Sequence, residues 1–227
     1  MKEHTETRPK CLLEVGGKAL LDHQIDSLKG AGIEEIGIVV GYRKELLSGR
    51  GLVEFFNPRW NETNMVSSLE CADEWLRGGP CLVSYSDIFY EAEGVRRLME
   101  CGFELAVSYD PNWEKLWTKR FGDPLIDAET FKMNQRGEIT EIGNKPRELS
   151  EIQGQYMGIL RFTPSSWAEV RRIREKLSDA RKDKMHMTGT LQLLIDQGNV
   201  PVMAVEYSGR WGEFDNAEDL LVHQELS

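Results

Sequence analysis

The sequence predicts an α/β fold of three layers, in which helices cover both faces of a mostly parallel, mixed β-sheet. Two observations support this prediction. Short, continuous apolar runs rich in β-branched residues, such as IGIVV at 36–40, are typical of strands buried on both faces. These runs alternate with segments whose apolar residues recur at helical spacing, and regular alternation of strand and helix favours a layered α/β sheet.

The predicted elements follow one another regularly along the first half of the chain. In the first helix, at 20–31, Leu21, Ile25 and Leu28 recur at helical spacing and glycines mark the end. The segments that follow are strands at 36–40 and 53–56, a helix at 65–76, a strand at 81–87, a helix at 93–101 and a strand at 104–109.

Residues 110–154 break this rhythm. The segment is polar, rich in turn residues and contains the alternating stretch EITEIG, so we expect a partly antiparallel excursion that forms one wall of a cleft. Regular elements then return as a strand at 158–162, helices at 165–177 and 188–198, a strand at 200–205 and a last helix from residue 217. No internal repeat or low-complexity linker divides the chain, so we predict one domain over residues 1–227.

The composition is that of a soluble globular protein, with 40% hydrophobic and 29% charged residues. No apolar run approaches the roughly 20 residues of a membrane-spanning helix, and the charged N-terminus lacks the apolar core of a signal peptide. We therefore predict a cytoplasmic protein without membrane insertion. The net charge of −10 argues against a nucleic-acid partner. The oligomeric state is open, with a homodimer as one option.

Two acidic residues are expected at the carboxyl edge of the sheet, where open α/β sheets bind their ligands. Asp87 follows the apolar run CLVSYS, and Asp215 lies in the loop before the last predicted helix. Each has an alternative explanation, since Asp215 could be a helix N-cap and Asp87 a solvated turn residue. Position alone does not decide between these interpretations.

Five motifs in order resemble segments of the sugar-phosphate and phosphocholine nucleotidyltransferases. They are residues 5–42 with the R-P-K segment, NPRWNETNMVSSLECA at 57–72, SYSDIFYE at 84–91, GQYMGILRFT at 154–163 and WGEFDNAEDL at 211–220. The likeness covers essentially the whole chain, and TNMVSSL and D-I-F-Y resemble the phosphocholine cytidylyltransferase-like branch most. It implies a Rossmann-like nucleotidyltransferase fold of the glycosyltransferase-A type.

The resemblance also implies roles for individual residues. Asp87 of the D-I-F-Y motif and Asp215 of the W-x-E-x-D motif would ligate Mg²⁺, and Lys10 would contact the phosphates of nucleotide and acceptor. These three would form the catalytic set. Asn64 and Lys145 resemble nucleotide-binding positions, with a helix cap or Asx turn as the alternative for Asn64 and a solvated loop lysine as the alternative for Lys145.

The chemistry of the implied reaction explains the need for two carboxylates. An anionic acceptor phosphate must attack the α-phosphorus of a nucleoside triphosphate, and carboxylates are hard ligands suited to Mg²⁺. The ion screens the repulsion and stabilises the departing pyrophosphate. The acceptor is already ionised, so no general base is needed.

We therefore predict an enzyme that joins CMP from CTP to a small phosphorylated acceptor, such as phosphocholine or an aminoalkylphosphonate. A sugar-1-phosphate nucleotidyltransferase that uses UTP or dTTP is the alternative within the enzyme class. A non-catalytic nucleotide-binding or regulatory relative is the alternative of another class.

The predicted acceptor site draws on aromatic and acidic residues. Trp113 and Trp117 are four residues apart and close to Asp110 in the irregular segment, and Tyr156 lies in GQYMG. Aromatic faces and acidic groups suit a quaternary ammonium or aminoalkyl group. The alternative is that the two tryptophans bury one face of a helix.

One departure from the family pattern concerns the start of the chain. Family members carry a first strand and a glycine-rich loop, of the type A-I-I-L-A-A-G-x-G-x-R-L, upstream of R-P-K, whereas only seven residues precede Arg8 here. The backbone N–H groups of that loop would hold the triphosphate. A misassigned start, a trimmed chain and true degeneration are the competing explanations, and we expect weak or absent activity for this chain.

Overall fold

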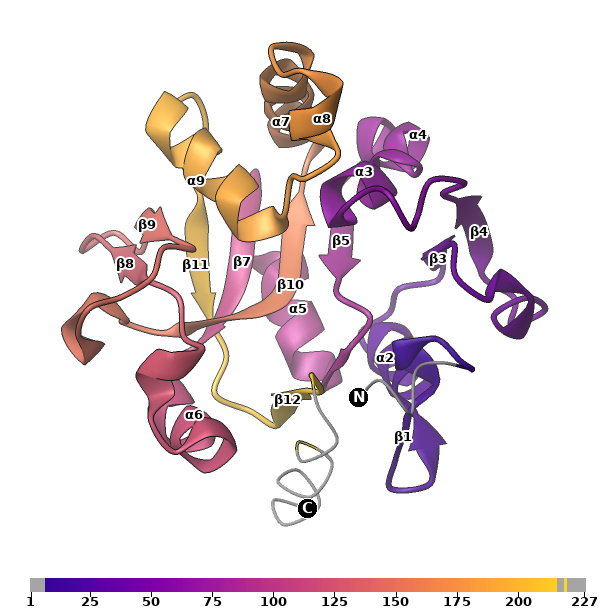
Figure 1. Ribbon diagram of the computed structural model, residues 1–227, viewed down its shortest axis with the longest axis horizontal. Coiled ribbons are helices and arrows are strands. Elements are labelled where there is room, and N and C mark those ends of the chain that lie inside the picture. The colour runs from indigo at the N-terminus through magenta and orange to yellow at the C-terminus, as the bar shows by residue number, and fades with distance from the viewer. Residues whose placement is uncertain (1–6, 216–218, 220–227) are drawn as a thin grey trace.

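The structure is a computed structural model that describes residues 7–215 and Asp219. Its centre is a four-stranded sheet with strand order β11-β7-β10-β5 (Figure 1). The strands are β5 (Cys81–Ser84), β7 (Leu105–Asp110), β10 (Gln155–Phe162) and β11 (Met203–Glu206). β11 runs parallel to β7, and β10 runs antiparallel to both of its neighbours. The predicted mixed sheet is therefore confirmed.

Side chains of the central strands supply two separate cores, one on each face of the sheet. Leu105, Val107 and Tyr109 of β7 belong to one buried cluster, whereas Ala106 belongs to the other. This division follows from the strand geometry, because successive side chains point to opposite faces. All six residues of β7 are buried, as expected of a strand covered on both sides.

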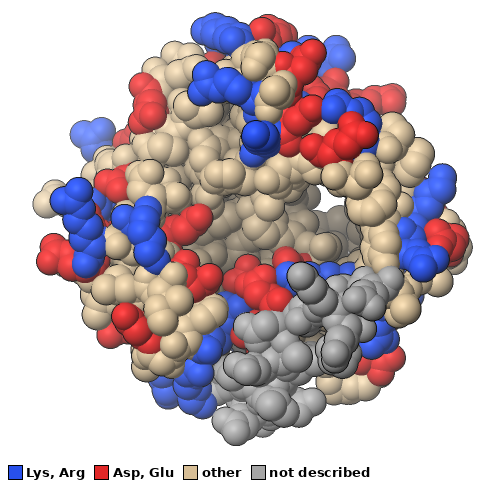
Figure 2. Space-filling view, viewed as in Figure 1, with Lys and Arg blue, Asp and Glu red and all other residues tan. Residues whose placement is uncertain are grey.

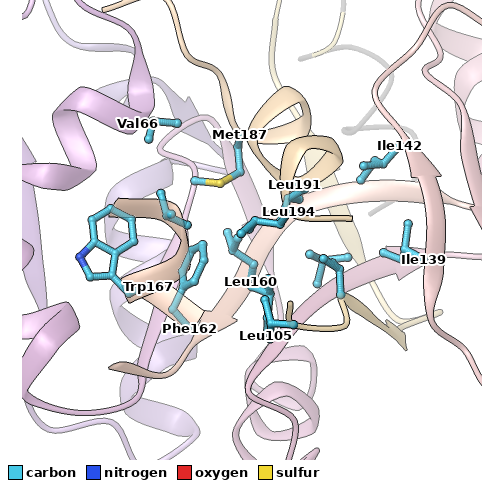
Figure 3. Packing of buried hydrophobic residues seen from close by; sticks show 14 of the residues in the cluster. Val66, Leu105, Ile139, Ile142, Leu160, Phe162, Trp167, Met187, Leu191 and Leu194 are labelled. Atoms are coloured by element: carbon cyan, nitrogen blue, oxygen red, sulfur yellow. The ribbon is translucent and has the colours of Figure 1, made fainter. Parts of the chain in front are cut away.

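Helices cover both faces and complete the three predicted layers. The first cluster includes residues of α7 (Pro164–Glu175) and α9 (Met187–Gln197), and Figure 3 shows Trp167, Leu191 and Leu194 packed there. The second cluster includes residues of α5 (Ala92–Glu100) and α6 (Trp113–Phe121).

Four two-stranded sheets flank the centre within the described residues. They are the parallel pair β3 (Gly37–Val40) and β4 (Val53–Phe56) and the antiparallel pairs β1 (Glu14–Val15) with β2 (Lys18–Ala19), β6 (Ile88–Tyr90) with β12 (Trp211–Glu213), and β8 (Phe131–Met133) with β9 (Ile139–Ile142). The β8–β9 hairpin confirms the antiparallel character predicted for 110–154.

The β3–β4 pair stands apart from the central sheet. Among the described residues, β5 pairs with β10 alone and β3 pairs with β4 alone. Figure 2 shows an opening through the molecule between the positions of β5 and β3. Strand edges of this kind carry backbone groups that can pair with another strand.

Two predicted elements are divided in the structure. The helix expected at 65–76 is broken into α3 (Met65–Glu70) and α4 (Asp73–Gly78), and the carboxylate of Asp73 accepts a hydrogen bond from the Trp167 indole at 2.8 Å. The strand expected at 81–87 ends at Ser84, because the chain leaves the central sheet to form β6. Asp87 consequently lies in the turn between the two strands.

The remaining described elements are short or close to their predicted bounds. They are α2 (Leu20–Gly30), α8 (Asp179–Lys182) and the 3₁₀ helices η1 (Lys10–Leu12), η2 (Lys44–Leu46), η3 (Pro124–Ile126) and η4 (Leu149–Glu151). The helix predicted from residue 217 lies outside the described residues, apart from Asp219. No helix in the described part of the chain has the length and apolar character needed to cross a membrane.

Candidate active site

The pairing of β6 with β12 brings the two predicted metal ligands to the same place. Ile88 pairs with Glu213 in this antiparallel ladder. One residue further, the backbone N–H of Phe214 donates to the carbonyl of Asp87 at 2.9 Å. Asp87 therefore precedes one strand and Asp215 follows the other, on adjacent segments.

A small apolar cluster attaches the N-terminal segment to these strands. Leu13, Phe89 and Phe214 are buried in this cluster, and η1, which begins at Lys10, immediately precedes Leu13. Because Leu13 packs with Phe89 and Phe214, Lys10 is carried to the strand ends where the aspartates lie.

The structure places Lys10 between the two aspartates. Its Nζ atom donates to Oδ2 of Asp87 at 2.7 Å and to Oδ1 of Asp215 at 2.9 Å. Burial on its own would lower the pKa of Lys10, but the charges of the two carboxylates and the hydrogen bonds to them raise it above its ordinary value. The lysine is therefore a fixed positive charge at this site.

Asp215 is held on its other side by Arg120 of α6. The guanidinium Nη2 atom donates to Oδ2 of Asp215 at 3.1 Å, and the same side chain also contacts Glu213 and Asp219. Burial raises the pKa of Glu213, and the charge of Asp215 raises it further against the opposing effect of Arg120. The site thus combines two cations with several carboxylates, and Figure 2 shows acidic side chains gathered at the base of the hollow on this face.

The donor set fits a Mg²⁺ ion that is shared with a substrate. Across residues 7–215 and Asp219, no group of three carboxylate, imidazole or thiol side chains is arranged to hold a metal ion unaided. Two aspartates facing one cation are nevertheless suitable, because Mg²⁺ is commonly bound by one or two carboxylates together with substrate phosphates and water.

The two predicted nucleotide-binding residues outside this centre make local contacts. Asn64 is the N-cap of α3, and its side chain accepts a hydrogen bond from the N–H of Met65 at 2.7 Å, as the helix-cap alternative proposed. Lys145 is exposed, and its Nζ donates to the carbonyl oxygens of Leu125 and Ile126. Neither placement tests a role in nucleotide binding.

Three of the predicted acceptor residues, Asp110, Trp113 and Trp117, lie in the core of this structure. Trp113 and Trp117 are 4% and 0% exposed, so neither ring offers a free face to a ligand. Trp117 stacks on Trp211, and the Trp211 indole donates to the buried carboxylate of Asp110 at 2.9 Å. The alternative that these tryptophans bury one helix face is the one that the structure shows.

The fourth predicted acceptor residue, Tyr156, lies in a group that the sequence did not reveal. Its ring meets Tyr85 edge-on with 5.8 Å between ring centroids. Its hydroxyl is buried and interacts with the Tyr85 side chain without a hydrogen bond of good geometry. Burial raises the pKa of Tyr156, and the charges of Glu129 and Glu213 act on both tyrosines. Tyr85 lies two residues before Asp87, and Glu213 lies two residues before Asp215, so the motifs themselves contained a signal for both.

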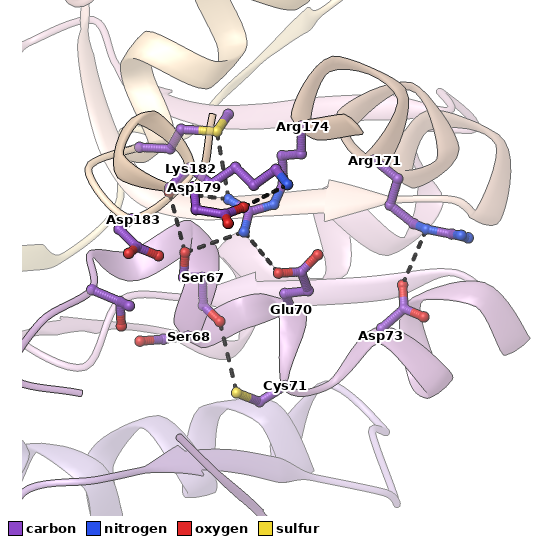
Figure 4. Close-up of polar contacts among 12 residues, drawn as sticks. Ser67, Ser68, Glu70, Cys71, Asp73, Arg171, Arg174, Asp179, Lys182 and Asp183 are labelled. Carbon is purple, nitrogen blue, oxygen red and sulfur yellow. Dashed lines mark hydrogen bonds and ion pairs between the residues drawn. The ribbon is translucent and has the colours of Figure 1, made fainter. Parts of the chain in front are cut away.

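A cavity of about 470 Å³ lies elsewhere, between α3 and the α7–α8 region (Figure 4). Basic side chains in its wall are already paired with acidic neighbours. The pairs are Arg174 with Glu70, Arg59 with Asp183, and Lys182 with Asp179. Neither Asp87 nor Asp215 lines this cavity, so the cavity does not mark the position of the reaction centre.

Known proteins resemble this chain in sequence. The family described as MobA-like NTP transferase domain matches residues 3–131. A CTP:phosphoglutamine cytidylyltransferase of Campylobacter jejuni subsp. jejuni is 37% identical, over 97% of this chain and 93% of that protein.

Solved structures share the fold at lower sequence identity. The inositol-1-phosphate CTP transferase from T. maritima has a TM-score of 0.77 at 16% identity, covering 100% of this chain and 90% of its own. The CTP:phosphocholine cytidylyltransferase from Streptococcus pneumoniae has a TM-score of 0.70 at 18% identity, covering 98% and 91%. The Rossmann-like fold expected from the motifs is thereby confirmed.

Proposed function

Because the chain belongs to the nucleotidyltransferase family that carries a MobA-like NTP transferase domain, we propose that it transfers CMP from CTP to a small phosphorylated acceptor. The observation that supports this most is the placement of Lys10 between Asp87 and Asp215 at the ends of β6 and β12. The preference for CTP rests on the three similar proteins described above, each of which is named as an enzyme that uses CTP.

In this proposal an oxygen of the acceptor phosphate attacks the α-phosphorus of CTP. The bond from that phosphorus to the bridging oxygen of the β-phosphate breaks, and pyrophosphate leaves with the bonding electrons. Asp87 and Asp215 would hold Mg²⁺, which when bound would screen the repulsion between the two anions and stabilise the departing pyrophosphate. An ionised acceptor makes a general base unnecessary.

Lys10 has a separate role in the proposal. Its ammonium group is a compact charge on a flexible stem, so it could turn from the carboxylates to the phosphate oxygens of a bound substrate. There it would orient the acceptor phosphate or the triphosphate and stabilise charge that develops during transfer. Asn64 and Lys145 remain proposed contacts of the nucleotide at the margin of this centre.

The acceptor group proposed here is one that carries a positive charge. Tyr85 and Tyr156 place two aromatic rings near the carboxylates of Glu129 and Glu213, and aromatic faces with acidic groups favour ammonium ions. A ligand could also satisfy the buried hydroxyl of Tyr156, which would otherwise be costly to leave without a partner. This group takes the place that the sequence assigned to Trp113 and Trp117.

Pyrophosphate release from the full chain tests the proposal. CTP and UTP are each combined with Mg²⁺ and with phosphoglutamine, phosphocholine, 2-aminoethylphosphonate or glucose 1-phosphate. We expect turnover with CTP and an amine-bearing acceptor, and the assay also measures whether the rate is as low as the sequence led us to expect. Turnover only with UTP and glucose 1-phosphate would contradict the proposed substrates.

Matched variants distinguish the loss of the metal ligands from a general loss of the folded structure. Asp87→Asn and Asp215→Asn should abolish turnover, whereas Asp26→Asn should not, since Asp26 is an exposed residue that pairs with Lys18. If the wild type binds CTP by calorimetry but shows no turnover with any acceptor, the non-catalytic alternative replaces this proposal.

A further inference from the structure

We propose that Arg120 is a positioning residue for Asp215, and that its guanidinium fixes which carboxylate oxygen of Asp215 faces the reaction centre. This inference rests on the proposed function, because it concerns how Asp215 is presented to a metal ion. Arg120 lies on α6, far in sequence from the motifs that carry the family resemblance.

The Arg120 guanidinium connects three carboxylates of the C-terminal segment. Nε donates to Oδ1 of Asp219 at 2.8 Å, and Nη2 donates to Oδ2 of the same residue at 3.2 Å. Nη1 donates to Glu213 at 3.2 Å, and Nη2 also donates to Asp215 at 3.1 Å. The Arg120 side chain is 0% exposed, so the guanidinium itself is shielded from solvent, whereas the Asp215 side chain is 44% exposed and remains open to a ligand.

The geometry requires arginine. Its planar guanidinium presents five donors in a fixed fork, whereas lysine presents one nitrogen atom. Trp117 and Phe121 flank the guanidinium, each ring centroid lying 4.8 Å from its central carbon. Trp117 therefore supports the arginine that holds Asp215, which is a role quite different from binding the acceptor.

The two oxygens of Asp215 are divided between two cations. Oδ2 accepts from Arg120, and Oδ1 accepts from Lys10 at 2.9 Å. The backbone is fixed as well, since the N–H of Asp215 donates to Oδ2 of Asp219 at 2.7 Å. Rotation of the Asp215 carboxylate would break one of these contacts, so Oδ1 is kept facing Lys10 and Asp87.

Arg174 offers a matched control for this arrangement. It is also buried, at 4% exposed, and its Nη2 donates to Glu70 at 2.7 Å and to Ser67 at 3.2 Å (Figure 4). It lies on α7, at the opposite end of the molecule from α6 and β12 in Figure 1. Its loss should cost stability without disturbing Asp215.

The test is a titration of the full chain with Mn²⁺ at a fixed concentration of CTP, because the site is proposed to share the ion with the substrate phosphates. Electron paramagnetic resonance follows the ion, a titration of CTP without protein is the reference, and thermal unfolding of each variant is measured alongside. We expect Arg120→Met to weaken Mn²⁺ binding by about 10- to 100-fold, the usual cost of removing a residue that orients a metal ligand. Arg120→Lys should bind Mn²⁺ much more weakly than the wild type, because lysine keeps the positive charge but lacks the planar set of guanidinium donors. Arg174→Met should unfold at a lower temperature and bind Mn²⁺ as the wild type does.

The outcomes that overturn the inference are distinct from those that overturn the proposed function. If both Arg120 variants bind Mn²⁺ as tightly as the wild type, the arginine is merely structural and the inference fails alone. If the wild type does not bind Mn²⁺, the metal site of the proposed function fails and the role of Arg120 fails with it. If Arg120→Met is too unstable to titrate, Arg120→Lys decides by the same criterion.

Discussion

Replacing Trp113 with alanine is expected to destabilise the protein and to leave acceptor binding unchanged. The indole is 4% exposed and its ring packs edge-on against Trp117 with centroids 6.4 Å apart. It belongs to the cluster between the central sheet, α5 and α6. The truncation therefore removes a large part of one core and opens a cavity there.

The size of the effect follows from this burial. Truncation of a buried tryptophan to alanine typically costs about 3–5 kcal/mol. A chain of this length loses about 2–4 °C in Tm for each kcal/mol, so the Tm should fall by about 6–20 °C. Trp60→Ala is the control, because Trp60 is 43% exposed and its loss should cost much less.

Thermal unfolding by calorimetry and steady-state kinetics with a turned-over acceptor check this prediction. The expected result is a large loss of Tm for Trp113→Ala with an unchanged KM for the acceptor. An unchanged Tm together with a clear rise in acceptor KM would refute the placement of Trp113 in the core and restore it as an acceptor residue.

Three further predictions concern the reaction centre and its surroundings. Lys10→Met should lower kcat by about 100- to 1,000-fold, as removal of a preorganised donor does, and a loss below tenfold in steady-state kinetics would speak against its role. Gly158→Ala should lower the free energy of unfolding by about 1–2 kcal/mol, because Gly158 has φ +77° and the added Cβ would meet the Tyr85 ring at 3.0 Å. Chemical denaturation measures this loss, and an unchanged midpoint would contradict the prediction. Tyr156→Phe should leave the free energy of unfolding unchanged or raise it, since the buried hydroxyl makes no hydrogen bond of good geometry with the described residues. The KM for the acceptor should rise, and equal KM values would remove Tyr156 from the acceptor site.

Local patterns were sufficient to predict many of the strands. The run VEFF forms β4 within its predicted bounds, and the apolar segment after Glu104 forms the fully buried β7. A continuous apolar run with β-branched residues identifies β7 because every residue in it is covered by neighbours. The division of 81–87 into β5 and β6 could not be predicted in this way, because it depends on pairing with β12, more than 100 residues later.

The candidate site shows the same limit. The motif order pointed to Asp87, Asp215 and Lys10, and the structure brings these three into contact. No sequence pattern around Arg120 identifies it as a site residue, because it acts through ion pairs with residues more than 90 positions away. The spacing of Trp113 and Trp117 was equally compatible with a core face and a ligand face, and only tertiary packing distinguishes the two.

Calorimetric titration of CTP with Mg²⁺ into the wild type and into Asp87→Ala tests the central claim most directly. The account predicts that CTP binds the wild type in a Mg²⁺-dependent manner, and that binding to the variant is weaker by about tenfold or more, which is at least about 1.4 kcal/mol. Equal binding by the two proteins would contradict the account, because Asp87 would then not hold the metal ion that accompanies the nucleotide.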